Sequence, residues 1–310
     1  MSGFTISNIN FELGALLDIG EIIELKQNAE RLKTFRAFGL SKFSLSEESE
    51  FSLALKSAKK TITESALDPS CIDCVIYSSS TLSNHDSKKQ ELSLMMKELL
   101  LSDVYPTGVF LSRCTNFSVA LRVAISKLSG DGFKNVLLIV SDKADGVSHK
   151  RVSFVSNHVA SDAAMSCIIS KTLKIGFEVK CLHHYSDQRL WCINPEQQFV
   201  EYLNKISEGV KAITQQTLTI SKLDRSSINH FICGNYNTSI MNNYCRLAGF
   251  ESSKLYMKNL SSIAHAFSAD QFISLKQVGE DSTIQESQIF MLGSGDYHWS
   301  GLIVKKLSVN

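Results

Sequence analysis

The sequence predicts an α/β fold, and three observations support this. Segments with the hydrophobic spacing of a helix alternate with short apolar segments that predict buried strands along most of the 310 residues. The second half of the chain repeats the order of these elements in the first half. Only three prolines are present and no low-complexity linker interrupts the pattern. Strands and helices that alternate in this way form sheets covered by helices.

In the first half, clear elements follow one another from residue 47 onwards. Each predicted strand is an apolar run, and each predicted helix has apolar residues at helical spacing. The elements are a helix over 47–66, a strand over 73–81, a helix over 86–101, a strand over 108–112, a helix from Cys114 to about Leu128, a strand over 135–142, and two strands over 165–170 and 174–182 that meet at a turn.

The second half shows the same plan. Its elements are a long helix over about 196–218, a strand over 231–234, helices over 238–248 and about 265–278, and two strands over 287–293 and 299–307. The repeated order predicts two similar α/β halves, residues 1–172 and 173–310.

The composition excludes several classes of protein. With 44% hydrophobic residues, 20% charged residues and a net charge of +1, the chain has no basic footprint for nucleic acid. No apolar stretch approaches the roughly 20 residues that span a membrane. Residues 1–23 lack a basic region followed by an apolar block, so no secretion signal is expected and the protein is expected in the cytoplasm.

The eight cysteines are spread through apolar segments, which indicates reduced thiols rather than a disulfide scaffold. Cys71 and Cys74 form a lone C-x-x-C, and no second cysteine pair or histidine pair completes a zinc site. No metal site is therefore expected.

Cys114 is the most informative residue. It lies in GVFLSRCTNFSVALRVAISKL (108–128), where a predicted strand meets a predicted helix. A thiol at such a junction lies near the positive end of the helix dipole, which favours the thiolate and makes the sulfur a candidate nucleophile. On these grounds alone, a buried structural cysteine remains an alternative.

Five segments, taken together and in order, resemble a known family. They are FRAFGLSKFSLSEESEFSLALKSAKKTI (35–62), SRCTNFSVALRVAISKLSGDGFKNVLLIVSD (112–142), SDAAMSCIIS (161–170), LDRSSINHFICGNYNTSIMNNYCRLAG (223–249) and LGSGDYHWSGLIVKK (292–306). Each is similar to a segment of β-ketoacyl-(acyl carrier protein) synthase III and its thiolase-fold relatives. The likeness covers nearly the whole chain.

The resemblance implies a thiolase fold of two similar α/β halves in a five-layered αβαβα arrangement. It also implies a homodimer, with the cysteine in the first half and the histidine and asparagine loops in the second. Cys114 would accept an acyl group from acyl-coenzyme A or from the phosphopantetheine of acyl carrier protein, with no permanently bound cofactor. The backbone N–H groups of Cys114 and Ser294 would form the oxyanion hole, and Arg36 and Arg246 would contact the carrier.

Two departures from the family pattern concern the mechanism. The family's catalytic histidine is replaced by Gly234, and His265 occupies a later position where synthase III enzymes carry asparagine. The pattern suggests a Cys114–His265 pair, with Asn235 or Asn237 as the second donor. A histidine that only satisfies neighbouring backbone groups is the structural alternative for His265.

Three functions remain open on this basis. The first is condensation of the Cys114 acyl thioester with a malonyl-type thioester in specialised metabolism. The second is acyl transfer to an alcohol or amine, for which His265 alone would be a sufficient base. The third is a degenerate partner subunit, in a heterodimer with an active synthase. Glycines of the family are replaced by Ser161, Ala163 and Ala164, which motivates this third alternative.

Overall fold

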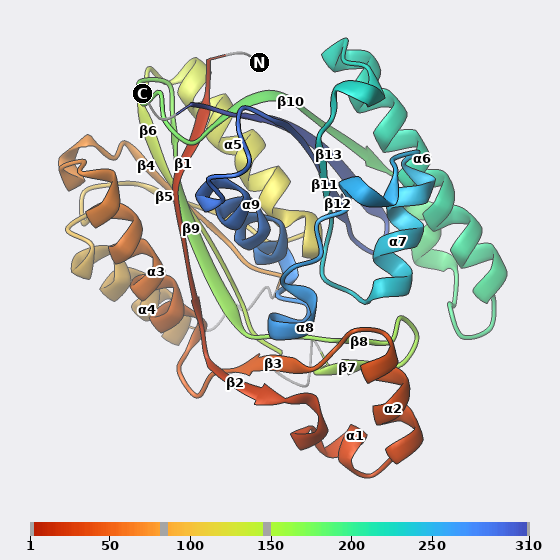
Figure 1. Ribbon diagram of the computed structural model, residues 1–310. Helices are drawn as coiled ribbons and strands as arrows, with labels where there is room; N and C mark the ends of the chain where they lie inside the picture. The colour runs from red at the N-terminus through yellow and green to blue at the C-terminus, as the bar shows by residue number, and fades with distance from the viewer. Residues whose placement is uncertain (1–2, 81–85, 145–149, 309–310) are drawn as a thin grey trace.

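The computed structural model describes residues 3–80, 86–144 and 150–308 (Figure 1). Its strands are β1 (Thr5–Leu13), β2 (Ala15–Asp18), β3 (Lys42–Leu45), β4 (Cys74–Ser78), β5 (Pro106–Val109), β6 (Asn135–Asp142), β7 (Val152–Ser153), β8 (His158–Val159), β9 (Ala163–Ser170), β10 (Phe177–Ser186), β11 (His230–Ile232), β12 (Gln288–Ser294) and β13 (His298–Lys306). Its α-helices are α1 (Ile23–Lys26), α2 (Ala29–Ala37), α3 (Glu50–Ser65), α4 (Asp86–Glu98), α5 (Asn116–Gly130), α6 (Phe199–Ser221), α7 (Thr238–Leu247), α8 (Leu260–Ile263) and α9 (Asp270–Glu280).

One mixed sheet runs through the molecule in the order β11-β12-β13-β10-β1-β9-β6-β4-β5. Strand β1 joins its two parts, because it pairs with β9 from Thr5 to Leu13 but with β10 only at Thr5 and Ile6. In the first half-sheet, β4 pairs in parallel with both β5 and β6. In the second, β11 and β12 are parallel while β12, β13 and β10 are antiparallel.

Alternate residues of the strands pack into different cores, as the two-residue period of a strand requires. On β6, Leu138 belongs to the central core, which also contains residues of α5 and α9, whereas Leu137 belongs to an outer core with residues of α3 and α4. On β12, Met291 belongs to the central core and Phe290 to a second outer core with α6 and α7. The result is the predicted five layers: α3 and α4, a half-sheet, α5 and α9, the second half-sheet, and α6 and α7 (Figure 1).

Local signals explain where several of these elements begin and end. The Ser49 side chain accepts a hydrogen bond from the Ser52 N–H and caps α3. The same helix ends at Ala66, which has a left-handed conformation. On α7, the side chain of Asn237 accepts from the Ile240 N–H and marks the first turn.

The structure corrects several details of the predicted elements. No clear pattern in the sequence indicated β1, β2, β3, α1 or α2, and β1 lies in the sheet between β9 and β10. Strand β5 ends at Val109, before most of the predicted 108–112 segment. Cys114 precedes α5 in a short 3-10 turn rather than opening it. The predicted helix over 265–278 begins only at Asp270. The last position of the predicted strand over 73–81 lies outside the described residues.

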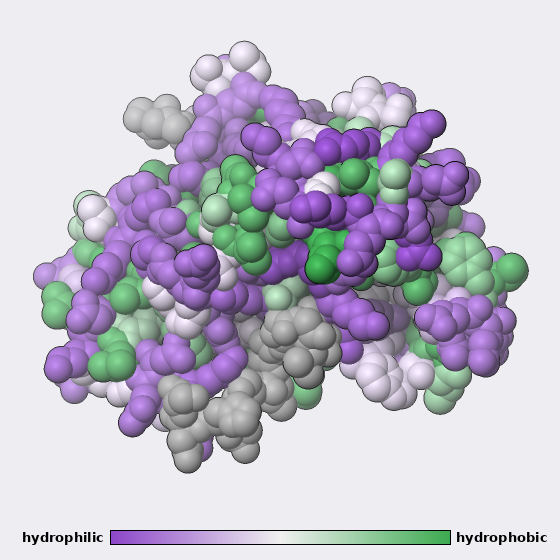
Figure 2. Space-filling model, turned by 90° about the horizontal axis from the view of Figure 1, so that it is seen from below, coloured by the Kyte–Doolittle hydropathy of each residue, from purple (hydrophilic) through white to green (hydrophobic). Residues whose placement is uncertain are grey.

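The predicted division at residue 172 falls between β9 and β10 and stays a prediction. Within the described part of the chain, no helix is long and apolar enough to cross a membrane. The face that carries β2, β3, α1 and α2 is mostly hydrophilic, and its hydrophobic residues lie in separate groups (Figure 2).

Candidate active site

Cys114 lies in a 3-10 turn, Arg113–Thr115, between β5 and α5, and is partly exposed. The turn is fixed by side chains of its own neighbours. The Thr115 hydroxyl donates to the Ser112 carbonyl over 2.6 Å. The Asn116 amide oxygen accepts from the Ser112 N–H over 2.7 Å. Arg113 has a left-handed φ of 47° and its guanidinium pairs with Asp296. This rigid turn holds the thiol at the start of the central helix layer.

His265 comes from the other half of the chain, and its Nε2 lies 3.3 Å from the Cys114 Sγ. The histidine follows α8 and precedes α9, and it is almost wholly buried. Its backbone N–H donates to the Val159 carbonyl over 2.9 Å, and its carbonyl accepts from the Ser161 N–H over 2.7 Å. The fold therefore brings together the cysteine and the histidine that the sequence paired.

Asp270 completes a chain of three residues, and the sequence analysis missed it. Its Oδ2 lies 2.5 Å from the Nδ1 of His265 and also accepts from the Asn235 N–H over 2.7 Å. Its Oδ1 accepts from the Ala266 N–H over 2.7 Å. Asp270 is fully buried and is the first residue of α9. The only signal in the sequence was an acidic residue five positions after the candidate histidine, within the helix predicted over about 265–278.

The electrostatics of His265 follow from this arrangement. Burial lowers its pKa, but the negative charge of Asp270 and that of the Cys114 sulfur outweigh burial, so that the pKa rises from 6.5 to about 10. Because the carboxylate holds Nδ1, the other ring nitrogen, Nε2, faces the sulfur. His265 can thus take a proton from Cys114 and keep it as an imidazolium.

The two predicted asparagines differ in their contacts. The side-chain oxygen of Asn237 caps α7, and its amide nitrogen donates to the carbonyls of Ser156 and Asn157, so these contacts fix the loop. Asn235 is also buried, but neither its amide nitrogen nor its amide oxygen has a partner among the described residues. An unpartnered buried amide is costly, which marks Asn235 rather than Asn237 as the group available to a substrate. Both catalytic roles stay predictions.

Ser294 ends β12, and the glycine beside it lies against the Cys114 turn. A side chain at Gly293 would place its first carbon 2.3 Å from the Ser300 hydroxyl oxygen and 3.3 Å from a Thr115 methyl carbon. The Ser294 carbonyl accepts from the Tyr236 hydroxyl over 2.6 Å. The close approach needs glycine at position 293. The oxyanion role of the Cys114 and Ser294 N–H groups stays a prediction.

Tyr236 is a second residue that the sequence analysis did not identify. Its ring centroid lies 4.5 Å from that of His265, at an interplanar angle of 33°. Burial, followed by the negative charge of Cys114, raises the pKa of the Tyr236 phenol well above its ordinary value. The tyrosine is therefore a neutral wall of the site at physiological pH.

The two predicted carrier-binding arginines lie on the surface and contact none of Cys114, His265 and Asp270. Arg36, on α2, pairs with Asp18 over 2.7 Å, and Arg246, on α7, donates to Asn243 over 2.8 Å. Their binding of a carrier stays a prediction. In the described residues, no cluster of three or more histidine, cysteine or acidic side chains has the arrangement of a metal site.

Neither a family model nor a curated protein sequence matches this chain. Solved structures do match it. ChlB3, described as an acyltransferase, has a TM-score of 0.85 at 15% identity, with 98% of each chain covered. The 3-oxoacyl-(acyl carrier protein) synthase III of Aquifex aeolicus VF5 has a TM-score of 0.79 at 17% identity, covering 98% of this chain and 100% of that one. A variant of OleA from Xanthomonas campestris has a TM-score of 0.79 at 16% identity, with 98% of each chain covered. At these identities the likeness establishes the fold, and it confirms the resemblance stated from the sequence: this chain has the thiolase fold in the form found in synthase III-like proteins.

Proposed function

We propose that this protein is an acyltransferase that carries its acyl group as a thioester on Cys114. The observation that carries the proposal is the continuous contact from the Cys114 sulfur through the His265 ring to the buried Asp270 carboxylate. A nucleophile, a base and a group that orients the base form the arrangement that covalent acyl transfer requires.

In the first step, Nε2 of His265 removes the proton from the Cys114 sulfur. The thiolate attacks the carbonyl carbon of an acyl thioester of coenzyme A or acyl carrier protein, and a new carbon–sulfur bond forms. The carrier's carbon–sulfur bond then breaks, and the departing carrier sulfur takes the proton from His265. Backbone N–H groups of Cys114 and Ser294 would stabilise the tetrahedral oxyanion.

The geometry around His265 favours an alcohol or amine as the acceptor. The Asp270 carboxylate raises the basicity of His265, which suits removal of a proton from a hydroxyl or amine that attacks the Cys114 thioester. The nucleophile's oxygen or nitrogen binds the carbonyl carbon, the Cys114 sulfur leaves, and His265 returns the proton to it. One base is sufficient for both half-reactions. ChlB3, a neighbour in fold, is itself described as an acyltransferase.

Decarboxylative condensation is a second candidate, and the unpartnered amide of Asn235 favours it. That reaction builds negative charge on the carbonyl oxygen of a malonyl thioester, and two donors facing this oxygen lower the barrier. The protonated His265 and the Asn235 amide would be these donors. The malonyl carboxylate would leave as carbon dioxide, and the resulting carbanion would attack the Cys114 thioester.

Mass spectrometry after incubation with acyl-coenzyme A or acylated carrier protein tests the proposal. We expect a thioester adduct on the wild-type protein and none on Cys114→Ala. Cys192→Ala is the matched control, since Cys192 is an exposed thiol outside the site. Absence of an adduct with every donor would refute the proposal. Release of carbon dioxide from a malonyl donor would select condensation over transfer to oxygen or nitrogen.

We also propose that a second copy of this chain pairs at β5, the last strand of the sheet in the described residues. Tyr105 and Leu111 flank this edge and are 79% and 76% exposed. Exposed apolar residues beside an edge strand indicate a partner. Sedimentation should give a dimer for the wild type and a monomer for Tyr105→Glu combined with Leu111→Glu. A heterodimer with a related synthase is the alternative, and co-purification would reveal it. We also propose that this acyltransferase acts in the cytoplasm, in specialised metabolism.

A further inference from the structure

The three residues that lead to the catalytic ring, 263–265, contain a strained backbone position. Ala264 has a φ of 57° and a ψ of −148°. This combination is essentially restricted to glycine, because the methyl group of alanine collides with the backbone there. Something must therefore hold Ala264 in this conformation. The consequence is direct, since the next residue is His265.

Hydrogen bonds from residues 159–161 fix both peptide groups that flank Ala264. The Ser161 hydroxyl donates to the Ile263 carbonyl. The His265 N–H donates to the Val159 carbonyl over 2.9 Å, and the Ser161 N–H donates to the His265 carbonyl over 2.7 Å. Of these bonds, the one from the hydroxyl is the only one that a particular side chain supplies. It reaches the carbonyl immediately before the strained residue.

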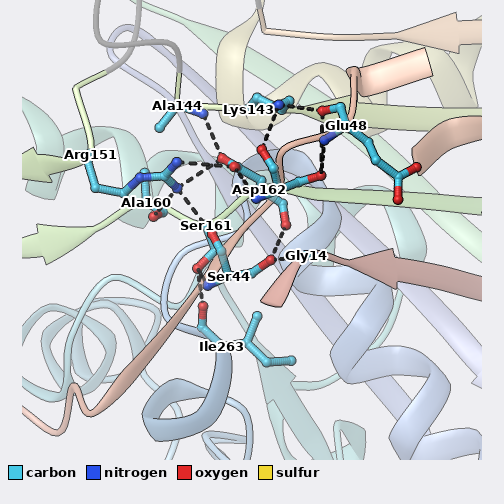
Figure 3. A network of polar contacts seen from close by, with 11 residues as sticks. Gly14, Ser44, Glu48, Lys143, Ala144, Arg151, Ala160, Ser161, Asp162 and Ile263 are labelled. Carbon is cyan, nitrogen blue, oxygen red and sulfur yellow. Dashed lines mark hydrogen bonds and ion pairs between the residues drawn. The ribbon is translucent and has the colours of Figure 1, made fainter. Parts of the chain in front are cut away.

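Ser161 is itself held from the amino-terminal half of the chain. It is fully buried, and its hydroxyl oxygen accepts from the Ser44 N–H over 3.0 Å. The adjacent Asp162 carboxylate is also fully buried and accepts from two backbone N–H groups and from the Arg151 guanidinium (Figure 3). The hydroxyl therefore connects a rigid polar network of one half to the histidine loop of the other.

We propose that Ser161 is a positioning residue: its hydroxyl holds Ala264 in the strained conformation and so orients the His265 ring toward the Cys114 sulfur. The inference rests on the proposed function only in requiring that His265 activates Cys114. Ser161 contacts neither the sulfur nor the ring, and it acts through the backbone of residues 263–265.

Alkylation of Cys114 by iodoacetamide, followed by peptide mass spectrometry, tests this role without any acyl substrate. Ser161→Ala should slow alkylation by about tenfold or more, since displacements near 1 Å can lower rates by up to a hundredfold. The ultraviolet absorbance of the thiolate, measured against Cys114→Ala, should fall in parallel. The matched control is Ser57→Ala. Ser57 is a fully buried serine on α3 that donates to the Asn10 carbonyl, and its loss should lower the thermal midpoint without changing alkylation.

Rescue separates a positioning role from a merely structural one. Glycine adopts the backbone angles of residue 264 without strain, so Ala264→Gly added to Ser161→Ala should return the alkylation rate to within about threefold of the wild type. A folded Ser161→Ala protein with wild-type alkylation would overturn the inference. A double variant as slow as Ser161→Ala would do the same.

His265→Ala keeps the two proposals distinguishable. If His265→Ala alkylates at the wild-type rate, the proposed base is wrong. If His265→Ala is slow and folded Ser161→Ala is not, only the positioning role is wrong. Should Ser161→Ala fail to fold, Ala264→Gly alone decides: relief of strain predicts a higher thermal midpoint, and a lower midpoint would overturn the inference.

Discussion

Replacing Asp270 by asparagine is the sharpest test of the proposed three-residue chain. The change removes one negative charge while keeping the size of the side chain. In the structure the carboxylate accepts from the N–H groups of Asn235 and Ala266 and contacts Nδ1 of His265. An amide would set its own N–H₂ group against one of these donors. The variant therefore loses the negative charge beside the ring that faces Cys114, and one of these hydrogen bonds.

The magnitude follows from the pKa of His265. Its rise from 6.5 to about 10, to which Asp270 and Cys114 both contribute, corresponds at about 1.4 kcal/mol per pKa unit to roughly 5 kcal/mol in favour of the imidazolium. The ring and the carboxylate are both buried, so solvent screens this interaction little. If about half of that energy stabilises the transfer of the proton from Cys114 to His265, Asp270→Asn should lower the reaction rate of Cys114 on the order of a hundredfold.

Iodoacetamide alkylation of Cys114 near pH 7, with thioester formation measured beside it, is the assay. The matched control is Asp73→Asn. Asp73 also accepts from two backbone N–H groups, those of Lys134 and Asn135, but at the amino ends of β4 and β6. Both variants should lower the thermal midpoint, since each disturbs backbone donors. Only Asp270→Asn should slow the alkylation and acylation of Cys114.

A folded Asp270→Asn protein that alkylates and acylates at the wild-type rate would refute the reasoning. It would mean that the carboxylate only supports the loop and that His265 needs no charged partner. An equal loss of Cys114 reactivity in Asp270→Asn and Asp73→Asn would also refute the reasoning, because general destabilisation would then explain the effect.

Three further predictions concern stability. Burial raises the pKa of Asp142 from 3.8 to about 6, so its contribution to stability is lost as pH rises through about 4 to 6, and Asp142→Asn should raise the thermal midpoint at pH 7.5. The raised pKa of His265 adds to the free energy of unfolding, fully below pH 6.5, and this contribution is lost as the pH rises to about 10. The free energy of unfolding of His265→Gln should therefore lack this decline at alkaline pH. A methyl group on Gly209 of α6 would lie 2.3 Å from the Trp299 ring, whereas one on Gly130 meets nothing within 4 Å; Gly209→Ala should therefore lose about 1–3 kcal/mol, and Gly130→Ala should lose none.

Much of the fold could be predicted because its buried strands are continuous apolar runs. Strand β6, Asn135–Asp142, is fully buried and agrees with the prediction residue for residue. Strand β1 was missed because TISNINFEL mixes polar and apolar residues. Two of its polar side chains find their partners only in the folded state: the Thr5 hydroxyl donates to carbonyls at the end of β9 and just beyond it, and the Asn10 amide donates to Glu64. No local pattern reports such partners.

The sequence predicted those site residues whose own type and position indicate their chemistry. The junction sequence indicated Cys114, and the family pattern indicated His265, two residues that lie 151 positions apart and meet in the structure. Asp270 gave no comparable signal, because the predicted helix over about 265–278 placed this residue inside a helix rather than at its start. Its meaning comes from the turn of residues 266–269, which folds the carboxylate back onto the histidine ring.

The absence of a histidine at position 234 is linked to Tyr236. A side chain at Gly234 would place its first carbon 2.9 Å from the Tyr236 ring, which is closer than such atoms approach. The tyrosine in turn packs on His265 and donates to the Ser294 carbonyl. A side chain at position 234 would therefore displace Tyr236. His265 is backed by the buried Asp270 carboxylate, and the His158 ring lies 5.1 Å from the His265 ring between centroids. In the proposed function, His265 backed by Asp270 is the base, and a strong base beside Cys114 favours a hydroxyl or amine as the acceptor.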